Sequence, residues 1–239
     1  MRLFEESELH VKGNVLSKEE FRLFAFEANT KPDPERLATF VKKAEIFLEK
    51  PLLALPVSRY RDFFVNGNRS EFQKYYMDRR GRLVVLGYAE MYERKGRFLE
   101  ALIDTVWATL EETTWLVPAH NKQNPVANDG LPSTWGDTTH GVAIFSASTG
   151  AYLAFIYSQL KEEMDAFAPE VGRRIVHEVH ERCIRPYLER SYFWTGENGK
   201  RPNNWNPWIT MEVALATALL SDDMTEREAV LSRAFVLSH

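Results

Sequence analysis

Apolar residues recur at intervals of three and four along most of the chain, which is the spacing of an amphipathic α-helix. The segment 33–49 shows this spacing in one row of side chains: Leu37, Phe40, Val41, Ala44 and Leu48. Longer helices are expected over about 70–95 and 97–113, and Gly96 lies between them where a glycine commonly ends a helix. Phe98, Leu102, Val106 and Leu110 form the apolar row of the second.

The same spacing predicts helices in four later segments: about 141–162, 168–189, 207–221 and 225–238. Ser17 with Glu20, and Thr225 with Glu228, have the spacing of a capping box at a helix start. Pro207 suits the first position of a helix. Gly81 and Gly87 argue against one unbroken helix over 70–95.

Two segments break the helical spacing, about 114–140 and 195–206, and both are rich in proline, glycine and asparagine. A loop as long as the first is unusual inside a compact domain and is often functional. Four of the six tryptophans lie in or beside these loops: Trp115, Trp135, Trp194 and Trp205. No segment has the pattern of a strand. The sequence therefore predicts an all-α fold of roughly eight or nine helices joined in pairs.

Composition narrows the function. The 239 residues are 44% hydrophobic, which is enough for the core of one large globular domain. The net charge of −4 lacks the excess of positive charge that is typical of nucleic-acid-binding proteins. One cysteine, Cys183, excludes a disulfide framework within the chain. No apolar stretch is long enough for a membrane span, and the acidic start MRLFEESELH is unlike a signal peptide, so we expect a cytoplasmic protein.

The densest cluster of ligand-binding side chains is the run Asn203, Asn204, Trp205, Asn206, Pro207 and Trp208 at a predicted helix start. Amides donate hydrogen bonds without adding charge, and a helix N-terminus favours anionic oxygen. Indole faces suit the apolar face of a sugar ring. The alternative is that Asn206 only caps the helix and that both tryptophans belong to the core.

A second candidate run leads from Trp115 to His120 and Asn121 in the long loop. Histidine titrates near neutral pH, so His120 could act as a general base or acid. The alternative is a buried, hydrogen-bonded histidine. His140, near Asp137, is a weaker loop candidate of the same kind.

A third candidate is the group Arg79, Arg80 and Arg82 beside Asp78, because guanidinium forks bind carboxylates. The alternative is pairing of these arginines with acids of the chain itself.

His177, His180 and Cys183 share helical spacing, but neither histidine lies on the apolar row of Val171, Ile175 and Val179. No fourth ligand is evident, so a solvated face is the better interpretation and we expect no metal or other cofactor in this chain.

Several runs together resemble the heparinase II/III-like proteins, over most of the chain from about residue 57. The runs are Gly96–Trp107, Glu111–Trp115, Pro118–Asn121, Pro186–Arg190 and, above all, NNWNPW at 203–208. The resemblance implies an incomplete (α/α) toroid of antiparallel helical hairpins. It also implies a polysaccharide lyase that cleaves uronic-acid-containing polymers by β-elimination.

In such a reaction, donors neutralise the uronate carboxylate, a base removes the C5 proton, and an acid, often a tyrosine, protonates the leaving oxygen at C4. The resemblance makes Asn204 the carboxylate donor, supported by Asn203 and Asn206, and implies that His120 and Asn121 face the substrate. Asn204 and His120 are the two catalytic candidates. The substrate-binding candidates are Asn203, Trp205, Asn206, Trp208, Trp115, Asn121, Arg79 and Arg80.

Two departures from the family are evident. Family members continue into a toroid segment with a catalytic tyrosine and a β-sandwich with a histidine and often a metal site, whereas this sequence ends at His239. Ala143 and Ser148 stand where a family stretch usually carries acids. We therefore expect residues 1–239 to form one helical domain, the N-terminal part of a longer toroid and inactive alone.

The expected partner is an acidic polysaccharide or oligosaccharide, with no nucleic acid and no membrane, and apolar surface left open by truncation would favour a homodimer. Two alternatives remain open. The chain could be a non-catalytic helical module that binds acidic glycans, or a helical scaffold for a protein partner with its tryptophans in the core.

Overall fold

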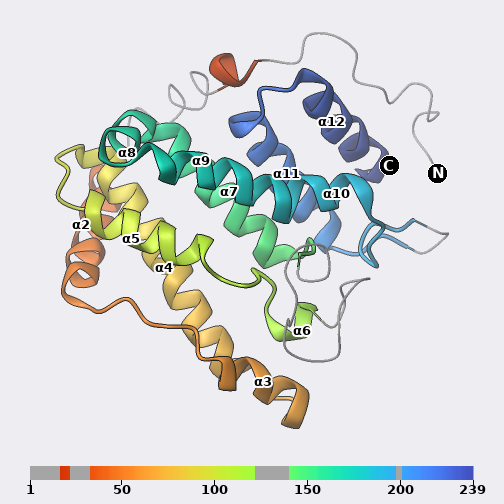
Figure 1. The fold of residues 1–239 in the computed structure, drawn as a ribbon, viewed down its shortest axis with the longest axis horizontal. Helices are drawn as coiled ribbons and strands as arrows, with labels where there is room; N and C mark the ends of the chain where they lie inside the picture. The colour runs from red at the N-terminus through yellow and green to blue at the C-terminus, as the bar shows by residue number, and fades with distance from the viewer. Residues whose placement is uncertain (1–16, 22–32, 122–139, 198–200, 239) are drawn as a thin grey trace.

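The computed structural model describes residues 17–21, 33–121, 140–197 and 201–238, and every regular element within them is helical. The all-α prediction is thus confirmed for the described part of the chain. Its elements, labelled in Figure 1, are α2 (Pro34–Glu49), α3 (Val57–Asn66), α4 (Ser70–Glu93), α5 (Leu99–Leu110), α6 (Pro118–Asn121), α7 (Ile144–Gln159), α8 (Lys161–Phe167), α9 (Pro169–Val179), the π-helical turn η2 (His180–Ile184), α10 (Arg185–Glu189), α11 (Trp205–Leu220) and α12 (Met224–Ser238).

Three antiparallel hairpins lie side by side. Helix α4 pairs with α5, α7 with the continuous helix α9–η2–α10, and α11 with α12. Tyr76 of α4 contacts the Phe145 carbonyl near the start of α7, and Gly87, further along α4, faces Ile156 further along α7. These helices therefore run in the same direction, and α11 packs along the other side of α7.

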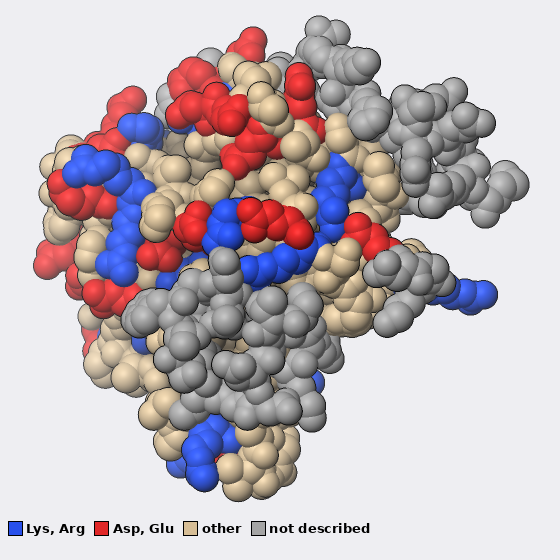
Figure 2. Space-filling view, turned by 45° about the vertical axis from the view of Figure 1, so that its right-hand side comes forward, with Lys and Arg blue, Asp and Glu red and all other residues tan. Residues whose placement is uncertain are grey.

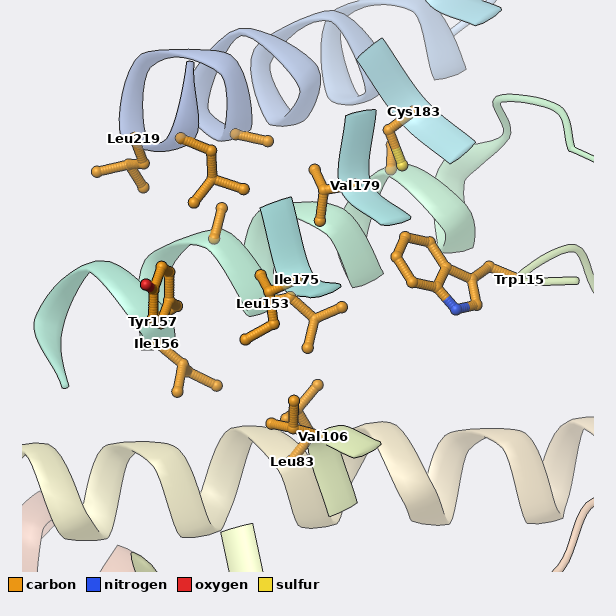
Figure 3. Packing of buried hydrophobic residues seen from close by; sticks show 14 of the residues in the cluster. Leu83, Val106, Trp115, Leu153, Ile156, Tyr157, Ile175, Val179, Cys183 and Leu219 are labelled. Carbon is orange, nitrogen blue, oxygen red and sulfur yellow. The ribbon is translucent and has the colours of Figure 1, made fainter. Parts of the chain in front are cut away.

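The hydrophobic core fills the space between the packed helices of these hairpins (Figure 3). Two of the three apolar rows expected from the sequence are buried: Phe98, Leu102, Val106 and Leu110 on and before α5, and Val171, Ile175 and Val179 on α9. The row expected over 33–49 is not, because only Ala44 of it is buried and Leu48 is exposed. Gly87 lets α4 approach α7 closely, because a Cβ atom there would lie 2.6 Å from Cδ1 of Ile156. Helix α4 is thus unbroken, with Gly87 at its close contact with α7, and Gly81 has no such neighbour.

Several expected boundaries differ from the structure. Helix α4 ends at Glu93 with Arg94 in the left-handed conformation (φ 48°), so the stop precedes Gly96. The segment expected as one helix over 141–162 is divided at Leu160 into α7 and α8. The helix over 168–189 contains the π-turn η2 just before Pro186, which lacks the N–H needed for a regular bond to the Arg182 carbonyl.

An asparagine or aspartate side chain bonds the backbone at the starts of α11 and α12. Helix α11 begins at Trp205 rather than Pro207, because the Asn203 side-chain oxygen accepts a hydrogen bond from the Trp205 backbone N–H at 2.6 Å. Asp223, not Thr225, caps α12 by accepting from the Thr225 N–H at 2.8 Å. The expected capping box of Ser17 and Glu20 is confirmed.

Acidic and basic side chains are interspersed on the face shown in Figure 2 rather than gathered by sign. Ion pairs along α9–η2–α10 account for part of this pattern, since Glu178 pairs with Arg182 and Arg185 pairs with both Glu181 and Glu189. Within the described ranges, no helix combines the length and the apolar character needed to cross a bilayer.

Candidate functional site

Two of the candidate runs, far apart in sequence, meet at the N-terminal ends of α7 and α11. His120, at the end of α6, stacks on Phe145 of α7 with ring centroids 4.9 Å apart. On another side, its ring centroid lies 4.5 Å from that of Trp205, the first residue of α11. Phe193 packs edge-on against Trp205 at 5.1 Å. The His120 run and the NNWNPW run thus form one aromatic cluster.

His120 is enclosed in this cluster and only 6% exposed. Burial, reinforced by the positive charge of Arg69, lowers the pKa of its imidazole to about 4. The ring is therefore neutral at pH 7, and its Nδ1 atom is buried without a hydrogen-bond partner among the described residues. A neutral imidazole can accept a proton, but with a pKa of about 4 the His120 ring would not keep that proton near pH 7.

The three asparagines at the start of α11 have three different environments. The Asn203 side-chain oxygen accepts from the Trp205 backbone N–H in a local turn just before α11. Asn206 is buried, donates to the Leu237 carbonyl of α12 at 2.5 Å and accepts from Thr210 at 2.9 Å. Asn204 is exposed. Among the three, Asn204 therefore has the amide that can reach a ligand from solvent.

Trp208 completes the exposed edge of this helix start. It is 58% exposed, the largest exposed aromatic among the described residues, and it follows Asn204 by one turn. Trp115 is instead 1% exposed in the core, where its indole N–H donates to the Thr109 carbonyl. Trp135 lies outside the described residues.

Asn121 follows His120 and is also buried, with its side-chain oxygen lacking a partner in the described part of the chain. It lies beside Tyr60 of α3. Burial raises the pKa of the Tyr60 hydroxyl above its usual range, and the neighbouring Asn121 side chain offsets part of that rise.

The three arginines of α4 are all buried, and each is engaged within the chain. Arg79 and Arg80 share the Glu112 carboxylate, with nitrogen–oxygen distances of 3.0 and 2.5 Å. Arg80 also donates to Thr149 and lies over the Tyr76 ring. Arg82 donates to Thr105 and to the Lys50 carbonyl. Arg79 and Arg80 thus pair with an acid of the chain itself, whereas Arg82 bonds to a hydroxyl and a carbonyl. Arg79 also lines a pocket between α3, α4 and the end of α5.

His177, His180 and Cys183 do not converge on a metal site. His177 is exposed, His180 lies between Glu181 and Glu226 at 2.9 Å from each, and Cys183 is fully buried against the Ser146 carbonyl. Among the described residues, no three His, Cys, Asp or Glu side chains are placed to hold a metal ion. Burial, with the nearby charge of Arg182, lowers the pKa of His140 to about 4, and its sequence neighbour Asp137 lies outside the described residues.

One titratable group that sequence reasoning missed is Glu212 of α11. Its carboxyl is 8% exposed and accepts a hydrogen bond of 2.6 Å from Ser148 of α7. Burial raises its pKa to about 7, which the Ser148 bond only partly opposes. The available signal was its position seven residues after Trp205, on the same face of α11.

Comparison with known protein families and with curated proteins finds no match to this chain. At the surface, the start of α11 offers an exposed amide, Asn204, and an exposed indole, Trp208, while the imidazole of His120 is buried beneath Trp205. An exposed amide and indole can bind a sugar ring and donate to an anionic oxygen without presenting net charge.

Proposed function

We propose that this chain binds an acidic, uronate-containing polysaccharide as part of a polysaccharide lyase with an (α/α) toroid. The observation that carries the proposal is the contact between His120 and Trp205, because it joins the two runs that resemble the family. Three side-by-side hairpins with co-directional α4 and α7 are also what a segment of such a toroid requires.

In the proposed site, Asn204 donates to the uronate carboxylate and Trp208 supports the apolar face of the sugar. Neutralising the carboxylate makes the C5 proton more acidic. His120, neutral at pH 7, is the residue we assign to receive that proton. The C4–O bond then breaks, a C4–C5 double bond forms, and the leaving oxygen takes a proton. No described residue is assigned to this last transfer.

A non-catalytic module that binds acidic glycans is the second candidate, and one observation favours it. His120 has a pKa of about 4, and Glu212, whose pKa is about 7, follows Asn204 by eight residues, or about 12 Å along a helix. Within the described residues, Asn204 therefore has no neighbour poised to exchange protons near pH 7.

Binding of alginate and heparan sulfate oligosaccharides, measured by titration calorimetry, tests the proposal. Asn204→Ala and Trp208→Ala should each weaken binding, whereas Phe167→Ala, which removes a similarly exposed ring at the end of α8, should not. Absence of binding, or binding that these two variants leave unchanged, would refute the assigned site.

Elimination is followed separately, by the ultraviolet absorbance of the unsaturated uronate product. Because no described residue is assigned to protonate the leaving oxygen, we expect little or no turnover, and robust turnover would refute that account of the site. Turnover in this assay separates a lyase from a module that only binds glycans.

A further inference from the structure

Four aromatic residues of α4 and α7 form a cluster that is open to solvent. The ring centroid of Tyr88 lies 6.1 Å from that of Tyr92, one turn further along α4, and 6.1 Å from that of Phe155 of α7. Tyr152, one turn before Phe155, is 39% exposed, and the other three side chains are half-buried. We call Tyr88, Tyr92, Tyr152 and Phe155 the tyrosine face.

The three phenol hydroxyls of the tyrosine face lie near one another, and the fold does not use them. Burial raises the pKa of Tyr88, and the neighbouring Tyr92 and Tyr152 add to that rise. Within the described part of the chain, none of the three hydroxyls has a hydrogen-bond partner, and none is among the buried polar atoms that lack one. The hydroxyls therefore reach solvent, and each can donate to a ligand or accept from it.

The tyrosine face continues toward the start of α11. Burial raises the pKa of Tyr152, and the nearby carboxyl of Glu212 adds to the rise, so Tyr152 lies close to α11. Trp208, which is exposed, precedes Glu212 by one helical turn on α11. A sugar chain that packs on Trp208 can therefore extend past Tyr152 to Tyr88.

Helices α7 and α11 bring almost no charge to this surface. Helix α7 has no charged side chain, and α11 has only Glu212, which is 8% exposed. Phenol rings pack on the apolar faces of sugars, and free hydroxyls replace the water that sugar hydroxyls bind. A further uronate there would lie near the acid Glu212 and would find no cation on either helix. The tyrosine face therefore suits an uncharged sugar ring.

We propose that the tyrosine face binds uncharged sugar rings of the same polysaccharide whose uronate is bound by Asn204. The hydroxyls of Tyr88 and Tyr152 bond to sugar hydroxyls in this complex. The substrate class is thereby narrowed to polymers that carry uncharged sugars between their uronates, as opposed to polyuronates. The placement of the uronate at Asn204 rests on the proposed function, whereas the tyrosine face rests on its own contacts.

Titration calorimetry of the full chain with two hexasaccharides tests the proposal. A hyaluronan hexasaccharide alternates glucuronate with uncharged N-acetylglucosamine, whereas an alginate hexasaccharide consists of uronates alone. We expect the hyaluronan hexasaccharide to bind at least about tenfold more tightly. Tyr88→Phe and Tyr152→Phe each remove one hydroxyl and keep the ring, so each should lower the affinity for hyaluronan by about three- to tenfold.

Tyr75→Phe is the matched control, because it removes a phenol hydroxyl from α4 at a position about 140° around the helix from Tyr88. It should leave both affinities within about twofold. The hydroxyls of Tyr88 and Tyr152 bond to nothing in the described chain, so their phenylalanine variants should keep the melting temperature of the original protein. An unchanged melting temperature shows that a loss of binding is local.

The contrary outcomes separate this proposal from the proposed function. Alginate that binds as tightly as hyaluronan, or hyaluronan binding that Tyr88→Phe and Tyr152→Phe leave unchanged, would overturn the tyrosine face as a site for uncharged sugars. If these variants weaken hyaluronan binding and Asn204→Ala does not, the tyrosine face stands and the proposed site at Asn204 is refuted. If only Asn204→Ala weakens it, the reverse holds. Absence of binding by either hexasaccharide overturns both.

Discussion

The middle of α4 and the start of α11 are both rich in side chains that bind carbohydrates and carboxylates, yet the fold uses them differently. Arg79 and Arg80 lie in mid-helix, between α5 and α7, and converge on Glu112. Asn204 and Trp208 lie where a loop enters a helix, and both are exposed. Position within the hairpin array, more than residue type, therefore decides which cluster can meet a ligand.

Two buried carboxyls sharpen this contrast. Glu112 receives two guanidinium groups, whereas Glu212 of α11 receives a single hydroxyl, from Ser148. A buried carboxylate with cationic partners is stabilised, and one without them holds its proton more tightly. Burial accordingly raises the pKa of Glu212 to about 7. The α4 region is a structural ion network, and the α11 face keeps an unneutralised acid.

Removing the centre of the α4 network should have the largest effect. Glu112→Gln leaves two buried guanidinium groups without a carboxylate, so we expect a loss of about 3–5 kcal/mol in unfolding free energy. Denaturant titration measures it, and the melting temperature should fall by roughly 10 °C. Glu111→Gln, at the exposed neighbour, is the matched control and should change little. If the two variants lost the same unfolding free energy, the buried ion pairs of Glu112 would stabilise the fold no more than the exposed carboxylate of Glu111 does.

The unneutralised acid of α11 should appear as a pH dependence. The folded pKa of Glu212, about 7, exceeds the usual value of 4.5, so the folded protein retains a proton that the unfolded chain releases. The contribution of Glu212 to stability is therefore full below pH 4.5 and is lost as the pH rises to about 7, by at most roughly 3 kcal/mol.

Glu212→Gln isolates this contribution, because the amide keeps the shape of the side chain and does not titrate. The unfolding free energy of the variant, minus that of the original protein, should rise between pH 4.5 and 7 and level off above. Taking this difference also removes the opposing effect of His120 and His140, whose lowered pKa values cost stability as the pH falls toward 4. A difference that does not vary with pH would contradict the burial of Glu212 as an unpaired acid.

At the start of α11, Asn204 and Asn206 should also differ in their effect on stability, the buried one mattering more than the exposed one. Asn206→Ala removes the bond to the Leu237 carbonyl and leaves Thr210 without its acceptor, at a cost of about 1–3 kcal/mol. Thermal unfolding should show this loss for Asn206→Ala and hardly any for Asn204→Ala. If neither variant changed the thermal unfolding, the packing of α12 on α11 would not depend on Asn206.

Sequence spacing predicted the helices well, because rows such as Phe98, Leu102, Val106 and Leu110 record directly which face is buried. It did not predict contacts between segments that are far apart in the sequence. Nothing local shows that Glu112 lies against Arg80, or that Ser148 lies against Glu212. The observed start of α11 also differs from the predicted one. The helix begins at Trp205, whose backbone N–H donates to Asn203, and Pro207 is its third residue rather than its first.

The smallest effect on stability should come from the exposed residues that define the proposed site. Asn204→Ala and Trp208→Ala remove side chains that the described fold does not use for packing, so each should change the unfolding free energy by no more than about 0.5 kcal/mol. Trp205→Ala should cost more, because its ring packs against His120 and Phe193. A residue whose replacement weakens glycan binding but leaves the unfolding free energy unchanged acts in binding rather than in folding. If Trp208→Ala destabilised the fold as much as Trp205→Ala, its indole would be part of the structure, and the contrast between α4 and the start of α11 would disappear.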